Sequence, residues 1–182
     1  TFIFSSSLDI NIINLIFGSH ILIYRLFSVL SIVLLGIIGY THIRKDFGEK
    51  TGLLFSFLTL FLPVASHYSG EIRMYSLGML LGTIMAIYAY RIYKGENKKT
   101  TYIFFGLSSL LVAYTHYYGL MLAGIINLLL FIFLVKNRKE RKNDLIKFIV
   151  TAAIQVVLYV PWLVCFLIQL KNVSSGFWIS LS

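Results

Sequence analysis

Two ionisable residues stand in a polar stretch between two strongly apolar segments. Glu71 and Arg73 lie two residues apart within residues 66–77, in a chain that otherwise keeps charge out of its apolar parts. Ionisable groups at the edge of a bilayer are costly and indicate a functional site. The Arg73 guanidinium suits a phosphate or a carboxylate, and the Glu71 carboxylate suits orienting a hydroxyl or taking its proton. The competing interpretation is a polar turn that caps a helix.

Four further residues extend this candidate site. Tyr75 and His67 each lie four residues from Glu71 and so share its face if the stretch is helical, while His116 and Tyr117 interrupt a later apolar stretch. We expect these four to bind substrate beside Arg73. A metal ion on His67, Glu71 and His116 is an alternative, but the spacing matches no closed metal motif. We therefore assign no metal site and leave the cofactor open, a divalent metal ion being the alternative.

Composition predicts the kind of fold that must position these residues. Hydrophobic residues make up 58% of the 182 and charged residues 13%, about half the typical share of a soluble domain. Mean hydropathy is +0.84. These values are typical of an all-α, polytopic membrane helix bundle. Because the chain begins at Thr1 and its last polar segment stops at Ser182, we expect a single transmembrane domain that is a fragment of a longer protein.

The chain divides into about six apolar spans. A span of about 20 residues matches the roughly 30 Å hydrocarbon core. Residues 1–20 are more polar and suit an interfacial helix or loop. Gly78 and Gly82 form a small-residue pair that favours close packing inside the bundle, and Pro161 is expected to kink or end the last span. The expected spans are residues 21–40, 52–66, 74–93, 102–114, 118–135 and 148–169.

The basic residues predict which side of the membrane each loop occupies. Thirteen of the sixteen Lys and Arg lie near three loops, at residues 41–51, 91–100 and 136–147. The positive-inside rule places these loops in the cytoplasm. The cytoplasmic loops thus account for most of the net charge of +9, so nucleic acid is not an expected partner. The candidate site then falls on the opposite, extracytoplasmic face.

Five short motifs occur in an order that resembles a known family. They are YRLFSVL at residues 24–30, GEIRMYSL at 70–77, AYTHYYGL at 113–120, VPWL at 160–163 and GFWI at 176–179. Together they resemble the bacterial members of the dolichyl-phosphate-mannose protein mannosyltransferase family, which are multi-pass glycosyltransferases of the GT-C fold. The resemblance covers most of the chain.

The resemblance implies transfer of a sugar from a polyprenyl-phosphate-linked donor to an acceptor at the outer face of the bacterial cytoplasmic membrane, with inversion of the anomeric centre. Family members use an acidic residue of the first outer loop as base. Asp9 lies too close to residues 24–30 for that role, so we expect the base upstream. Glu71, Arg73 and Tyr75 match the second outer loop, which implies catalytic support by Glu71 and donor-phosphate binding. His116 and Tyr117 match the third outer loop.

Two other classes of protein remain in competition. A transporter or lipid flippase predicts ionisable groups near the bilayer midplane and an internal repeat with broken helices. No such repeat is visible, and Gln155 and Thr151 are the main polar residues within the spans. A structural membrane subunit would have no need for Glu71, Arg73 and His116 to converge. We therefore favour the glycosyltransferase, a cell-envelope enzyme whose sugar and acceptor the sequence leaves open.

Overall fold

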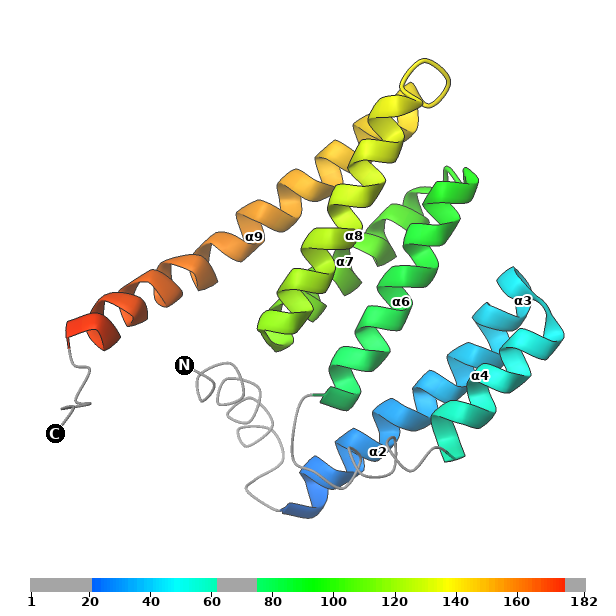
Figure 1. Cartoon of the computed structure of the whole chain (residues 1–182), viewed down its shortest axis with the longest axis horizontal. Coiled ribbons are helices and arrows are strands. Elements are labelled where there is room, and N and C mark those ends of the chain that lie inside the picture. Colours follow the sequence, from blue (N-terminus) through cyan, green and yellow to red (C-terminus); the bar gives the residue numbers. More distant parts are fainter. Residues whose placement is uncertain (1–20, 62–74, 176–182) are drawn as a thin grey trace, which may run out of the picture.

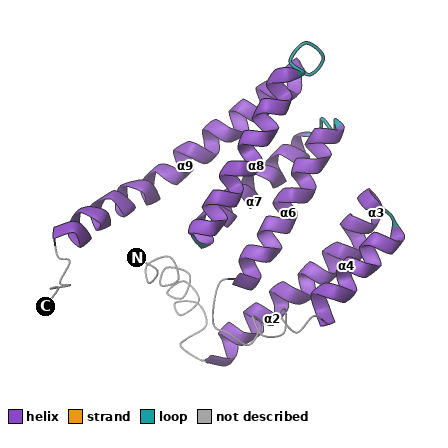
Figure 2. Ribbon diagram, viewed as in Figure 1, coloured by secondary structure: helices purple, strands orange, loops and turns teal. Residues whose placement is uncertain are grey.

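The computed structural model describes residues 21–61 and 75–175, and every regular element in these ranges is a helix (Figures 1 and 2). The all-α prediction is therefore confirmed for the described residues. Residues 1–20 and the motif at 176–179 lie outside them. The elements are α2 (Ile21–Ile38), η1 (Gly39–Ile43), α3 (Arg44–Phe47), α4 (Glu49–Phe61), α6 (Tyr75–Lys94), α7 (Lys99–Thr115), α8 (Tyr117–Lys136) and α9 (Lys142–Ser175).

Four helical stretches are long and apolar enough to cross a bilayer. They are Leu26–Phe47, Tyr75–Lys94, Tyr117–Lys136 and Lys142–Val164. Helices α4 and α7 occupy two further predicted spans, but their 13 and 17 described residues extend only about 20 and 26 Å at 1.5 Å per residue. Four of the six predicted spans thus reach the necessary length within the described residues.

The described helices extend beyond two of the expected span boundaries. The expected loop at residues 41–51 is mostly helical, because η1 and α3 continue α2 as far as Phe47 and the chain breaks only at Gly48 (φ 94°). Gly48 is the first residue there that adopts a left-handed φ without a steric penalty. In addition, α9 begins at Lys142, before the expected start at residue 148, and continues past Pro161 to Ser175. Proline removes a single backbone donor, and here the helix continues through that loss.

The core lies between α6, α7, α8 and the first turns of α9. Its most buried members include Met85, Ile92, Phe105 and Leu134. A Cβ at Gly82 would lie 3.3 Å from Leu122 Cδ2, so a larger side chain would push α6 away from α8. This contact confirms that the predicted small-residue pair packs inside the bundle. The helices α2 and α4 form a hairpin that packs on α6 through α2.

The helix ends differ in composition between the two sides of the bundle. Figure 1 places the α3–α4, α6–α7 and α8–α9 connections on one side, and the α7–α8 junction and the start of α6 on the other. We call the first side the basic end, because it carries the basic segments 44–50, 91–99 and 136–147. The second is the aromatic end, formed by Tyr75, residues 114–118, Tyr159 and Trp162. All three predicted cytoplasmic loops therefore share one side.

Candidate functional site at the aromatic end

The structure describes three of the six predicted site residues. His67, Glu71 and Arg73 lie outside the described residues. Tyr75 begins α6, and His116 joins α7 to α8 with Tyr117 following it. The ring centroids of Tyr75 and His116 are 5.8 Å apart. Two motifs separated in the sequence by about 40 residues are thereby brought together, and the end of the stretch that carries Glu71 and Arg73 is anchored beside His116.

His116 has a backbone role that fixes its imidazole. It is the N-cap of α8, in an extended conformation (φ −170°, ψ 170°), and Nδ1 accepts a hydrogen bond of 2.8 Å from the Gly119 N–H. An N-cap acceptor satisfies one of the unpaired donors in the first turn of a helix. Because Nδ1 is the acceptor, the proton of the neutral ring lies on Nε2. His116 therefore presents a donor whose direction is set by α8.

Two glycines lie beside this imidazole, one on α6 and one on α8. A Cβ at Gly78 would lie 3.5 Å from His116 Nε2, so Nε2 lies against the face of α6. A Cβ at Gly119 would overlap the Val112 carbonyl oxygen and lie 2.9 Å from Thr115 Oγ1. Only glycine allows the start of α8 to approach the end of α7 this closely. Gly119 thus permits the tight α7–α8 junction that holds the His116 ring in place.

An aromatic cluster continues the aromatic end onto α9. Tyr117 contacts Trp162 with ring centroids 6.0 Å apart, Trp162 contacts Tyr159 at 5.1 Å, and Tyr159 contacts Tyr114 at 5.3 Å. The Tyr114 hydroxyl also donates a 2.7 Å hydrogen bond to the Leu158 carbonyl. Sequence reasoning missed Tyr159 in this cluster. Its spacing before Pro161 and Trp162, at the predicted outer end of a span, was the available signal.

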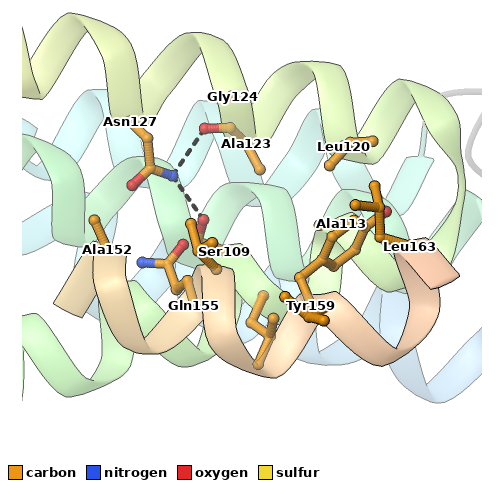
Figure 3. A pocket seen from close by; sticks show the side chains of 13 residues that line it. Ser109, Ala113, Leu120, Ala123, Gly124, Asn127, Ala152, Gln155, Tyr159 and Leu163 are labelled. Atoms are coloured by element: carbon orange, nitrogen blue, oxygen red, sulfur yellow. Dashed lines mark hydrogen bonds between the residues drawn. The ribbon is translucent and has the colours of Figure 1, made fainter.

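An apolar cavity lies beside this cluster. It has a volume of about 360 Å³ and lies between α7, α8 and α9, with Tyr159 and Leu163 at one end and Asn127 and Gln155 toward the other (Figure 3). Asn127 was also missed, although a single amide inside the apolar α8 is the kind of intramembrane polar group that indicates a site.

The metal alternative rests on His67, Glu71 and His116. Among the described residues, no three His, Cys, Asp or Glu side chains gather closely enough to hold a metal ion. Two of the three ligands considered from the sequence, His67 and Glu71, lie outside this part of the chain. His116 is the third, and its Nδ1 is already engaged by Gly119.

The helices of membrane-spanning length define an integral membrane protein of the multi-pass, all-α class. The sequence profile of the dolichyl-phosphate-mannose-protein mannosyltransferase family matches residues 7–165, most of the chain, and the chain belongs to this family. Membership implies a membrane glycosyltransferase that uses a polyprenyl-phosphate-linked sugar donor. No curated protein and no solved structure matches the chain.

Proposed function

We propose that this protein is a hexosyltransferase that moves a sugar from a polyprenyl-phosphate donor to an acceptor at the extracytoplasmic face of a bacterial cytoplasmic membrane. The observation that carries the proposal is the contact between Tyr75 and His116, which joins two family motifs at one end of the bundle. The basic end then faces the cytoplasm by the positive-inside rule. A lipid-linked donor also fits a chain without a nucleotide-binding motif.

Each candidate residue has a role that its chemistry supports. Arg73 binds the donor phosphate through charge-assisted hydrogen bonds, and Glu71 supports catalysis by orienting a hydroxyl of the substrates, while the base itself is expected upstream. Tyr75, His67 and Tyr117 line the same site. His116 donates from Nε2 to an oxygen of the donor, since Nδ1 is held by the helix. A preorganised donor of this kind stabilises the charge that develops as the sugar–phosphate bond breaks.

The proposed fold is that of the GT-C glycosyltransferases with six spans in this chain. Helices α4 and α7 supply the two spans that are short in the described residues. A span shorter than the hydrocarbon thickness is accommodated by local thinning of the bilayer or by snorkelling of flanking residues. Lys98 and Lys99 at the start of α7 are suited to this.

The test is sugar transfer in membranes that contain the complete protein, with labelled polyprenyl-phosphate sugars as donors. Wild type is compared with Arg73→Ala and Glu71→Gln at matched expression, and with Lys171→Ala as a control for loss of a positive charge on the same predicted side. We expect transfer by wild type and the control, and loss of about 100-fold or more in the two site variants. Transfer by all four proteins would contradict the assigned site.

If no donor gives transfer, the enzymatic proposal itself is overturned. The same membranes then serve to measure flipping of polyprenyl-phosphate lipids between leaflets. Flipping without transfer would identify a lipid flippase, which is the alternative considered from the sequence.

A further inference from the structure

The cavity between α7, α8 and α9 contains polar atoms whose hydrogen-bonding needs the described chain does not meet. Asn127 Oδ1, Gln155 Nε2 and the Tyr159 hydroxyl are buried and have no hydrogen-bond partner among the described residues. A buried polar atom without a partner costs about 1–3 kcal/mol. Such a cost is typical of a place where a ligand supplies the missing partner.

The orientation of the Asn127 amide is fixed by its own contacts. Its Nδ2 donates to the Ala123 carbonyl at 2.8 Å and to Ser109 Oγ at 2.8 Å. Rotating the amide by 180° would place Oδ1 against the Ala123 carbonyl oxygen, which is repulsive. The arrangement in Figure 3 therefore leaves Oδ1 as an acceptor that requires a donor.

Gln155 supplies the complementary group from the facing helix. In Figure 3 Gln155 and Asn127 lie at the same end of the cavity, and Gln155 Nε2 and Asn127 Oδ1 point the same way in that view. One is a donor and the other an acceptor. A hydroxyl placed between them accepts from Gln155 and donates to Asn127, whereas a carboxylate or an ammonium group can satisfy only one of the two.

The rest of the cavity lining favours an uncharged ligand that is mostly aliphatic. None of the residues that line it carries a formal charge, and the others are mostly aliphatic, among them Leu120, Ala123, Val156 and Leu163. Its 360 Å³ is within the range of small-molecule pockets and holds about a dozen water-sized groups. Val156 and Leu163 are 65% and 45% exposed, so the cavity opens toward the lipid side of α9.

Its depth places the amide pair far from either membrane surface. Asn127 lies ten residues beyond Tyr117 in α8, about 15 Å along the helix axis, which is half of a roughly 30 Å hydrocarbon core. A lipid headgroup does not reach this depth, and an unsubstituted hydrocarbon chain has no group to offer the amides. A single water would satisfy the amides but would leave most of this volume unfilled.

We propose that the cavity binds an uncharged aliphatic molecule that carries one hydroxyl group, with the hydroxyl between Asn127 Oδ1 and Gln155 Nε2. The aliphatic chain extends along Ala123 and Leu120 toward Tyr159, so the ligand supplies partners for the two amides and not for the Tyr159 hydroxyl. The ligand enters from the bilayer past Val156 and Leu163. This binding is independent of sugar transfer, so its test does not use that activity.

The test is photolabelling of the protein in phosphatidylcholine nanodiscs with a decanol that carries a diazirine in its chain, followed by peptide mapping by mass spectrometry. We expect adducts in α8 and α9 beside Asn127 and Gln155. Unlabelled decanol should compete more strongly than decane and decanoate, by about three- to tenfold for one hydroxyl held by two hydrogen bonds. Absence of cavity adducts, or equal competition by decane, overturns the proposal.

Two variants and a matched control separate recognition from folding. Gln155→Leu removes a donor that already lacks a partner, so the fold is retained while the preference for decanol over decane disappears. Ala152→Leu narrows the cavity and reduces labelling by every probe. Thr151→Val is the control, because Thr151 Oγ1 donates to the Lys147 carbonyl of its own helix. If Gln155→Leu and Thr151→Val label and compete alike, the proposal is wrong.

Discussion

The basic end and the aromatic end hold the same helices together by different means. At the basic end, charged side chains bind groups of the chain itself. Arg91 pairs with Asp46 at 2.8 Å, and Arg141 donates to the Tyr93 carbonyl at 2.8 Å. At the aromatic end, ring contacts between Tyr75 and His116 and among the tyrosines join the helices.

This difference shows that the number of charges does not indicate the site. The Arg91–Asp46 pair is largely shielded, with side chains 15% and 13% exposed, and it connects the α2–α4 hairpin to α6. Arg141 satisfies carbonyls at the end of α6, where a helix favours a positive group. The basic end therefore has structural uses for its charges. The sparse polar groups of the aromatic end are the better candidates for chemistry.

The largest expected effect on stability is at the α7–α8 junction. Gly119→Val should lower the free energy of unfolding by about 3 kcal/mol, because its Cβ would overlap the Val112 carbonyl oxygen. Thermal unfolding in detergent, followed by circular dichroism, measures this. Gly124→Ala in the same helix is the matched control, because a Cβ there meets nothing within 4 Å, and it should be neutral or slightly stabilising. Equal effects of the two variants would contradict a tight junction.

The second effect tests the ion pair at the basic end. Asp46→Leu should cost about 2–3 kcal/mol, since it leaves Arg91 shielded without its partner. The double variant Asp46→Leu/Arg91→Met should recover most of that loss in the same unfolding assay. Arg44→Met serves as control, because the Arg44–Glu49 pair is 37% and 64% exposed and its loss should cost less than about 0.5 kcal/mol. If the double variant does not recover stability, the unpaired Arg91 is not the cause of the loss in Asp46→Leu.

A third, smaller effect concerns the aromatic end. Tyr114→Phe removes the hydrogen bond to the Leu158 carbonyl but keeps the ring beside Tyr159. The expected loss is about 1 kcal/mol, measured as a shift in unfolding temperature. Tyr118→Phe is the control, because Tyr118 is 68% exposed and should unfold as wild type does. A larger loss of stability for Tyr118→Phe than for Tyr114→Phe would mean that the Tyr118 hydroxyl, and not the Tyr114 hydroxyl, makes the stabilising hydrogen bond.

The smallest effect is a pH dependence at the basic end. A hydrogen bond from Lys98 lowers the pKa of Glu96 below its usual value of 4.5. A carboxyl group whose pKa is lower in the folded state stabilises the fold at pH values above its unfolded-state pKa. That stabilisation is lost as the pH falls through the folded-state pKa. Because Lys98 is 74% exposed, Glu96→Gln should change the stability difference between pH 7 and pH 4 by less than about 0.5 kcal/mol. A change above 1 kcal/mol would contradict this.

Local sequence patterns predicted much of the fold. The break at Tyr114 to Gly119 was expected because polar residues interrupt an apolar stretch, and His116 is indeed the one residue between α7 and α8. The helical continuation from Thr41 to Phe47 could not be predicted from its charged residues, because a helix can carry charge beyond the bilayer until a glycine ends it.

Contacts between distant residues could not be predicted. Asp46 and Arg91 are 45 residues apart and pair only because α2 packs on α6. The same holds for Asn127 and Gln155, whose amides face one cavity from two helices. The approach of His116 to Tyr75 followed from the predicted sidedness of the loops, but the capping role of Nδ1 required the backbone of α8.

His116 provides the most direct test of a transferase site at the aromatic end. Asparagine is a good N-cap, so His116→Asn keeps an acceptor for the Gly119 N–H but removes the donor at Nε2. We would measure kcat/KM for sugar transfer together with the unfolding temperature. We expect a loss of about 100-fold in kcat/KM for His116→Asn, with only a small fall in unfolding temperature from the lost ring contact with Tyr75. Full transfer by His116→Asn, with only stability lost in His116→Ala, would show that His116 merely caps α8 and would contradict the account.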